Sequence, residues 1–170
     1  PPRTLSLSHP ITHVSSSKAT SRNMEPLHIT KRFTFEMAHA LRGYDGPCRH
    51  IHGHSYVLEV SVGGPLGAAG AADEGMVMDF GALKTIVQQA VLERYDHALV
   101  LHTDERAAIP MDHPLFARTI FVAWQPTCEN LLKDVVERIR HQLPADLRLA
   151  HARLHETATN WAEWSAAFSR

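Results

Sequence analysis

The sequence predicts an α+β fold in which two helices cover one face of an antiparallel sheet. Residues 27–41 and 56–63 alternate polar residues with apolar ones, as half-buried strands do. Two later segments instead repeat their apolar residues at helical spacing. Two more alternating segments follow, so the predicted order of elements is ββααββ.

The strands are predicted from short alternating runs rich in Val, Ile, Phe and Thr. The first two, residues 27–41 and 56–63, are expected to run antiparallel. The Gly- and Ala-rich residues 63–75 indicate a flexible connection. Residues 147–156 and 161–168 predict the third and fourth strands, and a further short strand is expected at 119–123.

The two helices are predicted from their caps and their apolar faces. Asp79 is a good N-cap for a first helix that ends near Tyr95, and Thr127, after Pro126, is the N-cap of the second. The buried face of the first helix comprises Leu83, Ile86, Val87, Ala90 and Val91. That of the second comprises Leu131, Leu132, Val135, Val136 and Ile139.

Composition limits the classes of protein to consider. With 170 residues, 44% of them hydrophobic, the chain suits one domain with a substantial core. A net charge of −1 gives no electrostatic reason to expect nucleic acid or a membrane surface as a partner. No apolar stretch approaches the roughly 20 residues of a membrane span. Cys48 and Cys128 are too few for a disulfide framework, which favours the cytoplasm as the location.

The segment 1–26 differs from the rest of the chain. It is rich in Ser, Thr, His and Pro without sustained periodicity, which predicts a disordered arm. It also lacks the apolar core of a signal peptide. Met24 is a candidate for the native start, and an arm that becomes ordered on assembly is the alternative. The folded domain is expected over residues 27–168.

The most informative segment for function is Cys48-Arg-His-Ile-His52-Gly-His54. His52 and His54 are two residues apart, so an extended chain directs both imidazoles to one face. A catalytic zinc site needs three protein ligands and one open position. His39, near the end of the first predicted strand, is the best candidate for the third ligand. The segment therefore predicts a metal site with a thiol beside it.

Other interpretations of this segment stay open at this point. The chain contains 13 His, so pairs at a spacing of two can arise by chance. His50 has the same parity as His52 and His54 and is an alternative ligand or a solvated loop residue. Cys48 is either a reactive group near the metal or a fourth ligand that closes a structural site, because Cys and His combine in such sites.

Six motifs stand in the order seen in the 6-pyruvoyl tetrahydropterin synthase / QueD family, which the chain resembles over about residues 27–164. They are Phe35-Glu-Met-Ala-His39, Cys48-x3-His52-Gly-His54-Ser-Tyr56, Met78-Asp79-Phe80, Asp96-His97, Pro126-Thr-Cys-Glu-Asn130 and Glu156-Thr157. Animal enzymes that form a pyruvoyl product resemble C-x5-H-G-H, whereas the queuosine branch resembles C-x3-H-G-H, the spacing found here.

The resemblance implies a fold and an activity. The fold is the tunnelling fold, in which sheets of several subunits join into a β-barrel, here a homohexamer of two trimers with active sites between subunits. The implied substrate is 7,8-dihydroneopterin triphosphate, converted in the queuosine branch to 6-carboxy-5,6,7,8-tetrahydropterin with release of acetaldehyde and triphosphate. The alternatives are a 6-pyruvoyl tetrahydropterin synthase or related pterin lyase and, outside enzymes, a zinc-binding module.

The resemblance also assigns roles to residues. The implied ligands of Zn²⁺ are His39, His52 and His54. The implied catalytic residues are Cys48 as general base and the acid/base pair Asp96 and His97. The implied contacts to the pterin come from Glu156, Thr127, Glu129 and Thr157. Glu156 suits this role because two carboxylate oxygens match the paired N–H donors of a pterin edge.

Three further expectations concern the surroundings of this site. In the family's pair the carboxylate fixes the tautomer of the imidazole, but adjacent side chains on a regular helix or strand do not face each other, so a Cys or His of a neighbour is the alternative partner of Asp96. Glu36 lies on the opposite strand face from His39, which argues against a zinc hydrolase with a carboxylate base. Cys128 is expected to be a packing residue.

The sequence does not decide which basic residues bind the triphosphate. The candidates are Lys31, Arg32, Arg42, Arg49, Lys84 and Arg94.

Overall fold

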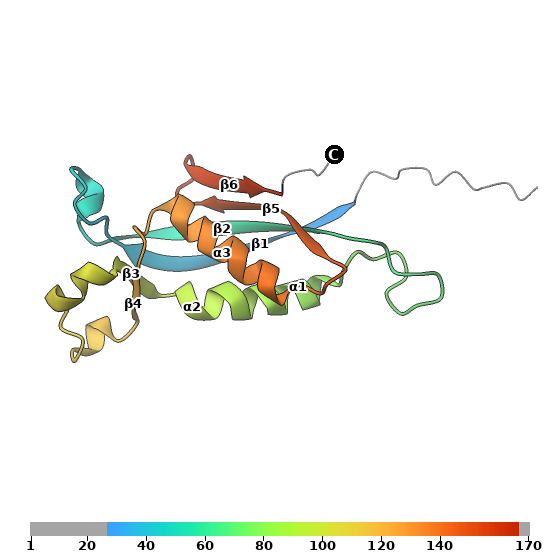
Figure 1. Cartoon of the computed structure of the whole chain (residues 1–170), viewed down its shortest axis with the longest axis horizontal. Coiled ribbons are helices and arrows are strands. Elements are labelled where there is room, and N and C mark those ends of the chain that lie inside the picture. The colour runs from blue at the N-terminus through green and yellow to red at the C-terminus, as the bar shows by residue number, and fades with distance from the viewer. Residues whose placement is uncertain (1–26, 167–170) are drawn as a thin grey trace, which may run out of the picture.

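The structure is a computed structural model that describes residues 27–166. In this part of the chain six strands form a single sheet in the order β4-β3-β1-β2-β5-β6. The strands are β1 (His28–His39), β2 (His52–Gly63), β3 (Ala98–His102), β4 (Thr119–Val122), β5 (Arg148–His155) and β6 (Trp161–Ser165). The main helices lie across one face of this sheet (Figure 1).

The centre of the sheet is the long antiparallel pair β1 and β2. The two strands pair over their whole length, from His28 opposite Gly63 to His39 opposite His52. β2 pairs with β5, and β5 with β6, also antiparallel. These four strands confirm the predicted antiparallel sheet. However, β2 begins at His52, earlier than the predicted 56, because its first residues complete the pairing with β1.

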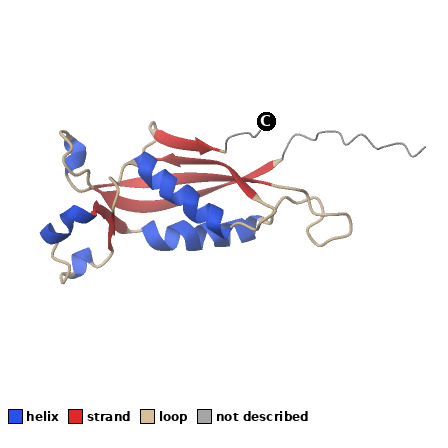
Figure 2. Ribbon diagram, viewed as in Figure 1, coloured by secondary structure: helices blue, strands red, loops and turns tan. Residues whose placement is uncertain are grey.

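The β1 edge of the sheet carries two short strands, which lie at the left of the ribbon diagram (Figure 2), and both pair in parallel. β4 confirms the short strand predicted at 119–123, whereas β3 was not predicted. Three of the five residues of β3 are buried, with no alternation along the strand. Such continuous apolar runs are typical of parallel strands that are covered on both faces. The helical apolar pattern directly before β3 makes its short run hard to recognise as a separate strand. The sheet is therefore mixed.

The first helical region is continuous but not uniform. It comprises α1 (Phe80–Val87), the π-helical turn η2 (Gln88–Leu92) and α2 (Glu93–Tyr95). The Asp79 side chain accepts hydrogen bonds from the backbone N–H groups of residues 81 and 82, which confirms it as the N-cap. The predicted end near Tyr95 is also confirmed.

The second helical region is α3 (Cys128–Gln142), capped by Thr127 as predicted. It packs over β5 and β6, and the region from α1 to α2 lies beside it on the same face of the sheet (Figure 1). The core fills the space between these helices and the sheet. Its largest fully buried side chains include Tyr56, Tyr95, Leu58, Leu83, Leu131, Ile139 and Leu154.

The other face of the sheet is polar. Arg32 on β1 pairs with Glu59 on β2 at 2.7 Å, and Arg153 on β5 pairs with Glu163 on β6 at 2.7 Å. Among the described residues, no helix is both long and apolar enough to span a bilayer. The arm expected at 1–26 and the last residues of the strand predicted at 161–168 lie outside the described residues.

Candidate metal centre and active site

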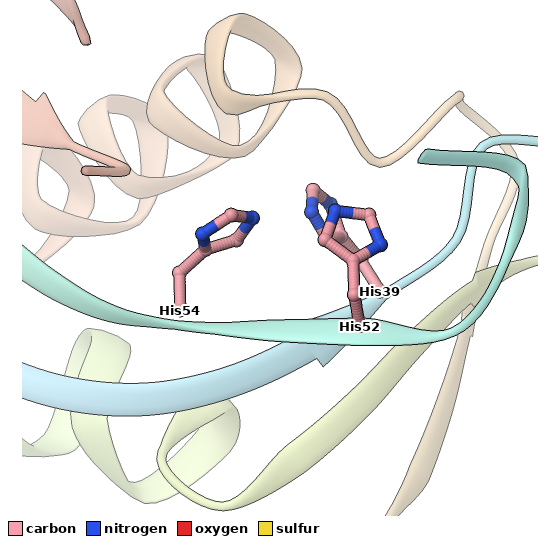
Figure 3. Close-up of side chains that lie close together, drawn as sticks. All are labelled: His39, His52 and His54. Carbon is pink, nitrogen blue, oxygen red and sulfur yellow. The ribbon is translucent and has the colours of Figure 1, made fainter. Parts of the chain in front are cut away.

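Three imidazoles from β1 and β2 converge on the helix-covered face of the sheet. His39 and His52 are direct cross-strand partners, and His54 is two residues further along β2, so the pleat points all three to one side. Figure 3 shows the three rings gathered on this side of the two strands. One nitrogen from each ring lies within 4.8 Å of the others, as a metal ion would require. The structure thus brings the predicted metal ligands together.

The outer nitrogens of two rings are fixed by backbone carbonyls. Nδ1 of His39 lies 2.6 Å from the carbonyl oxygen of Pro126, and Nδ1 of His52 lies 2.8 Å from that of His50. When the rings are neutral, these Nδ1–H groups donate and Nε2 keeps its lone pair. Nε2 of His39 and Nε2 of His54 are buried without a hydrogen-bond partner among the described residues. Three neutral imidazoles of this kind fit a zinc ion.

Burial tunes two of these rings for metal binding. It lowers the pKa of His39 and of His54 below the usual 6.5, and this effect outweighs the opposing attraction of the Glu156 carboxylate. Both rings therefore favour the neutral form, which is the form that binds metal.

The carboxylate of Glu156 lies next to the imidazole cluster. Its Oε1 lies 3.7 Å from Nε2 of His39 and 3.9 Å from Nε2 of His54. The hydroxyl of Tyr56 donates to the same oxygen at 3.4 Å. These contacts place the predicted pterin anchor next to the predicted metal ligands, at the end of β5.

Cys48 lies in the short 3₁₀ turn η1 (Pro47–Arg49) between β1 and β2. Its carbonyl accepts a hydrogen bond of 2.9 Å from the N–H of Leu41, which ties this turn to the end of β1. The thiol is half-buried and is not part of the group of ligand atoms that the three imidazoles form. In this geometry Cys48 is not placed as a fourth metal ligand. His50 contributes only its carbonyl, to His52.

Asp96 and His97 contact each other, so of the two alternatives for the partner of Asp96 this chain has the direct one. Nδ1 of His97 lies 3.0 Å from Oδ1 of Asp96. The reason is the backbone of His97, whose φ of 59° is left-handed and folds the ring back toward the preceding side chain. Asp96 also accepts a hydrogen bond from the N–H of Glu36 at 2.9 Å. This carboxylate favours the tautomer of His97 that has a free Nε2.

The Asp96–His97 dyad is separate from the imidazole cluster within one chain. His97, whose side chain is 73% exposed, borders a hollow of about 390 Å³ that Glu36 and Ser55 also line. By alternation along β1 and β2, Glu36 and Ser55 project from the face opposite to the metal ligands. His54 also borders this hollow, but by the same alternation its ring projects from the opposite face, so within one chain the ring of His97 does not face the rings of the three imidazoles.

The remaining predicted contact residues lie at two turns near the cluster. Thr127 and Glu129 occupy the start of α3, which the bond between His39 and Pro126 holds beside the metal ligands. The hydroxyl of Thr127 caps this helix, and Glu129 is exposed. The hydroxyl of Thr157 accepts hydrogen bonds from the next turn, from the N–H groups of residues 159 and 160.

Cys128 behaves as the expected packing residue. It is buried, its thiol donates to the carbonyl of Leu154, and burial raises its pKa to about 11. A thiol of this kind is not reactive at neutral pH.

Sequence reasoning assigned no role to two groups that organise this site. The carbonyl of Pro126 orients His39, and the hydroxyl of Tyr56 holds Glu156. A signal for Tyr56 was present, because it has the same strand parity as His52 and His54 and so lies on their face. No local sequence pattern indicated that the carbonyl of Pro126 would orient His39.

Comparison with known proteins gives a consistent result. The 6-pyruvoyl tetrahydropterin synthase family model matches residues 28–167. A 6-carboxy-5,6,7,8-tetrahydropterin synthase from Haemophilus influenzae is 37% identical over 139 residues, which cover 80% of this chain and 96% of that protein. A 6-pyruvoyl tetrahydrobiopterin synthase from Drosophila melanogaster is 29% identical over 144 residues, or 78% of this chain and 75% of that protein.

Solved structures share the fold. The 6-pyruvoyl tetrahydropterin synthase of Caenorhabditis elegans superimposes with a TM-score of 0.60 at 20% sequence identity, covering 85% of this chain and 98% of that chain. An uncharacterised protein from Wolinella succinogenes gives 0.63 at 19% identity, covering 82% and 98%. With a matching family model over most of its length, this chain belongs to the 6-pyruvoyl tetrahydropterin synthase family of enzymes.

Proposed function

We propose that this enzyme converts 7,8-dihydroneopterin triphosphate into 6-carboxy-5,6,7,8-tetrahydropterin, releasing acetaldehyde and triphosphate in a zinc-dependent reaction. Atom balance requires the uptake of one water per turnover. The pathway that uses the product is that of queuosine or a related deazapurine. The proposed location is the cytoplasm.

The observation that carries this proposal is the convergence of three imidazoles beside Glu156. It occurs in a chain that is 37% identical to a 6-carboxytetrahydropterin synthase over 96% of that relative. The spacing of three residues between Cys48 and His52, which resembles that branch, supports the same choice. A protein that only binds zinc, without catalysis, would not need the Glu156 carboxylate beside the metal ligands.

Each group in the site has a chemical task. His39, His52 and His54 hold the zinc ion, which when bound supplies Lewis-acid stabilisation of negative charge on a substrate oxygen. Cys48, as thiolate, removes a proton from the substrate side chain. Glu156 accepts hydrogen bonds from the N–H groups of the pterin and so fixes the ring. Thr127, Glu129 and Thr157 contribute at the edge of the ring.

The acid/base pair Asp96 and His97 acts in the site of a neighbouring subunit. In one chain the ring of His97 lies on the side of Glu36 and Ser55, whereas strand alternation points the three metal-binding rings to the opposite face. An assembly in which β-sheets join edge to edge would bring His97 of one subunit toward Cys48 of the next. It would also cover the strand edges that a single sheet leaves unpaired. The proposed assembly is a homohexamer built from two trimers.

The decisive experiment is mass spectrometry of the products formed from 7,8-dihydroneopterin triphosphate, with acetaldehyde, triphosphate and bound metal measured on the same sample. We expect 6-carboxytetrahydropterin and acetaldehyde in equal amounts. Accumulation of a pyruvoyl pterin with triphosphate and no acetaldehyde would assign the chain to the pyruvoyl-forming branch. Zinc binding without any affinity for pterins would refute the enzymatic proposal.

A further inference from the structure

Arg118 caps the end of the helical region that leads to the Asp96–His97 dyad. Its Nη2 donates to the carbonyl oxygens of Glu93 at 3.3 Å, of Arg94 at 3.4 Å and of Asp96 at 2.8 Å. The shortest of these bonds is thus made to the residue that holds His97. A guanidinium group at this position also complements the negative end of the helix dipole.

This helix end takes a donor from a distant segment of the chain because the left-handed residue that directly follows it does not provide one. After a helix, the N–H of a residue in the left-handed conformation usually closes back onto the last turn. Here the N–H of His97 instead donates to the carbonyl of Glu36 on β1, at 2.6 Å. That bond docks the dyad on the sheet but leaves the last helical carbonyls without their usual partner. Arg118 is the residue that satisfies them.

Arg118 is itself held in place by the sheet. Its carbonyl accepts a hydrogen bond of 3.1 Å from the N–H of Leu99, immediately before β4 pairs with β3. It also lines the hollow that His97 borders. Arg118 therefore binds the chain on both sides of His97. Its backbone carbonyl bonds to Leu99, which follows His97 in the sequence, and its side chain bonds to Asp96, which precedes it.

We propose that Arg118 is a positioning residue for His97. Arg118 holds the backbone of His97 in the left-handed conformation that puts the His97 ring against Asp96. Arg118 acts through the backbone carbonyls and not on the substrate. The inference rests on the proposed function, in which His97 takes part in proton transfer. It adds a residue from the connection between β3 and β4, a segment in which none of the motifs above lies.

The kinetic test compares Arg118→Ala with Arg106→Ala. Arg106 is a matched control, because it lies in the same connection and its guanidinium stacks on Phe121 at 4.2 Å without touching the helix end. With 7,8-dihydroneopterin triphosphate as substrate, we expect Arg118→Ala to lower kcat at least ~10-fold, since misplacing a catalytic group by about 1 Å can cost up to ~10²-fold. KM and bound zinc should stay near the wild-type values, and Arg106→Ala should match wild type.

Chemical rescue separates positioning from general damage to the fold. Millimolar guanidinium ion should restore part of the lost kcat in Arg118→Ala, and Arg118→Lys should retain more activity than the Ala variant. Kinetic constants of Arg118→Ala equal to those of Arg106→Ala would overturn the proposal. If the Ala variant fails to fold, Arg118→Met decides, because it keeps the apolar stem but has no donor, and wild-type kcat in that variant would equally refute a need for a donor at the helix end.

A second readout does not depend on activity. The Cε1–H resonance of His97, assigned by its loss in His97→Ala, should shift in the Arg118 variants and stay unchanged in Arg106→Ala. An unchanged resonance in folded Arg118→Ala would overturn the positioning role. Full turnover in His97→Ala would be a different failure, since it would remove His97 from the proposed reaction and leave the structural effect of Arg118 on the ring intact.

Discussion

The hydroxyl of Tyr56 and the carboxylate of Glu156 are joined by a hydrogen bond of 3.4 Å, across 100 residues of sequence. Tyr56 is fully buried and stacks on Phe35, and burial raises its pKa, so the phenol remains a donor at any physiological pH. The oxygen of Glu156 that accepts this bond also faces His39 and His54. Tyr56 therefore fixes the position of the proposed pterin anchor relative to the metal ligands.

Removing this hydroxyl should weaken pterin binding without affecting the metal. In Tyr56→Phe we expect the Kd for a pterin ligand to rise about fivefold, because a hydrogen bond contributes about 1 kcal/mol net. Isothermal titration of neopterin onto the zinc-loaded protein, with metal analysis, measures both quantities. Tyr95→Phe is the control, since it removes another buried phenol that donates to a carboxylate, that of Asp134. Equal Kd values in the two variants would contradict the role of Tyr56.

Metal binding and proton transfer should respond to different substitutions. Cys48 lies outside the group of ligand atoms, so Cys48→Ala should keep its zinc while losing about 10²- to 10⁴-fold in turnover, the usual range for general base catalysis. His52→Ala should lose both. Metal analysis and product formation on the same preparations check this. Substantial zinc loss in Cys48→Ala would show a closed structural site instead.

The stability of the metal-free protein should fall as the pH is lowered from about 7.5 toward 5. Burial lowers the pKa of His39 and His54 below 6.5, so the unfolded chain binds more protons than the folded one in this range. Their contribution to stability is fully present above the unfolded pKa of about 6.5 and is lost as the pH falls through the folded values. Urea unfolding in the presence of a chelator measures the trend.

A matched variant tests whether His39 causes this trend. His39→Asn keeps a side-chain N–H that can donate to Pro126, but it has no ring to protonate. We expect a smaller loss of stability at low pH in this variant, together with loss of zinc binding. An unchanged pH dependence would mean that other groups dominate it.

Two inactive variants should complement each other if the active site spans two subunits. We expect Cys48→Ala and His97→Ala to be inactive alone. When they are unfolded together and refolded at equal amounts, random cyclic assembly should place an intact Cys48 next to an intact His97 in about one quarter of the sites. Product formation and light scattering follow activity and size. A complete absence of recovered activity in the mixed hexamer would argue for a site within one chain.

The sheet core and the metal ligands could be predicted because local patterns determine them. Alternation along β1 buries Phe33, Phe35 and Met37 on the same face as His39, and the same period places His52 and His54 on one face of β2. The pairing of these two strands then brings the ligands together. Each step follows from the two-residue period of a strand.

Other features depend on contacts between distant residues, which no local pattern contains. The strand at Ala98–His102 has no alternation because it is covered on both faces. The contact between Asp96 and His97 requires a left-handed His. His adopts this conformation more often than most residues but still in a small minority of cases, so the residue type alone does not predict it. The capping of that turn by Arg118 spans more than 20 residues of intervening chain.

The direct pairing of His39 with His52 has a consequence for how the β1–β2 hairpin folds. A slip of one residue between the two strands would send the side chains of one strand to the opposite face. His39 would then be separated from His52 and His54 by the thickness of the sheet. A hairpin slipped by one residue cannot present all three imidazoles to a single ion, so bound metal would stabilise the native register selectively over that alternative.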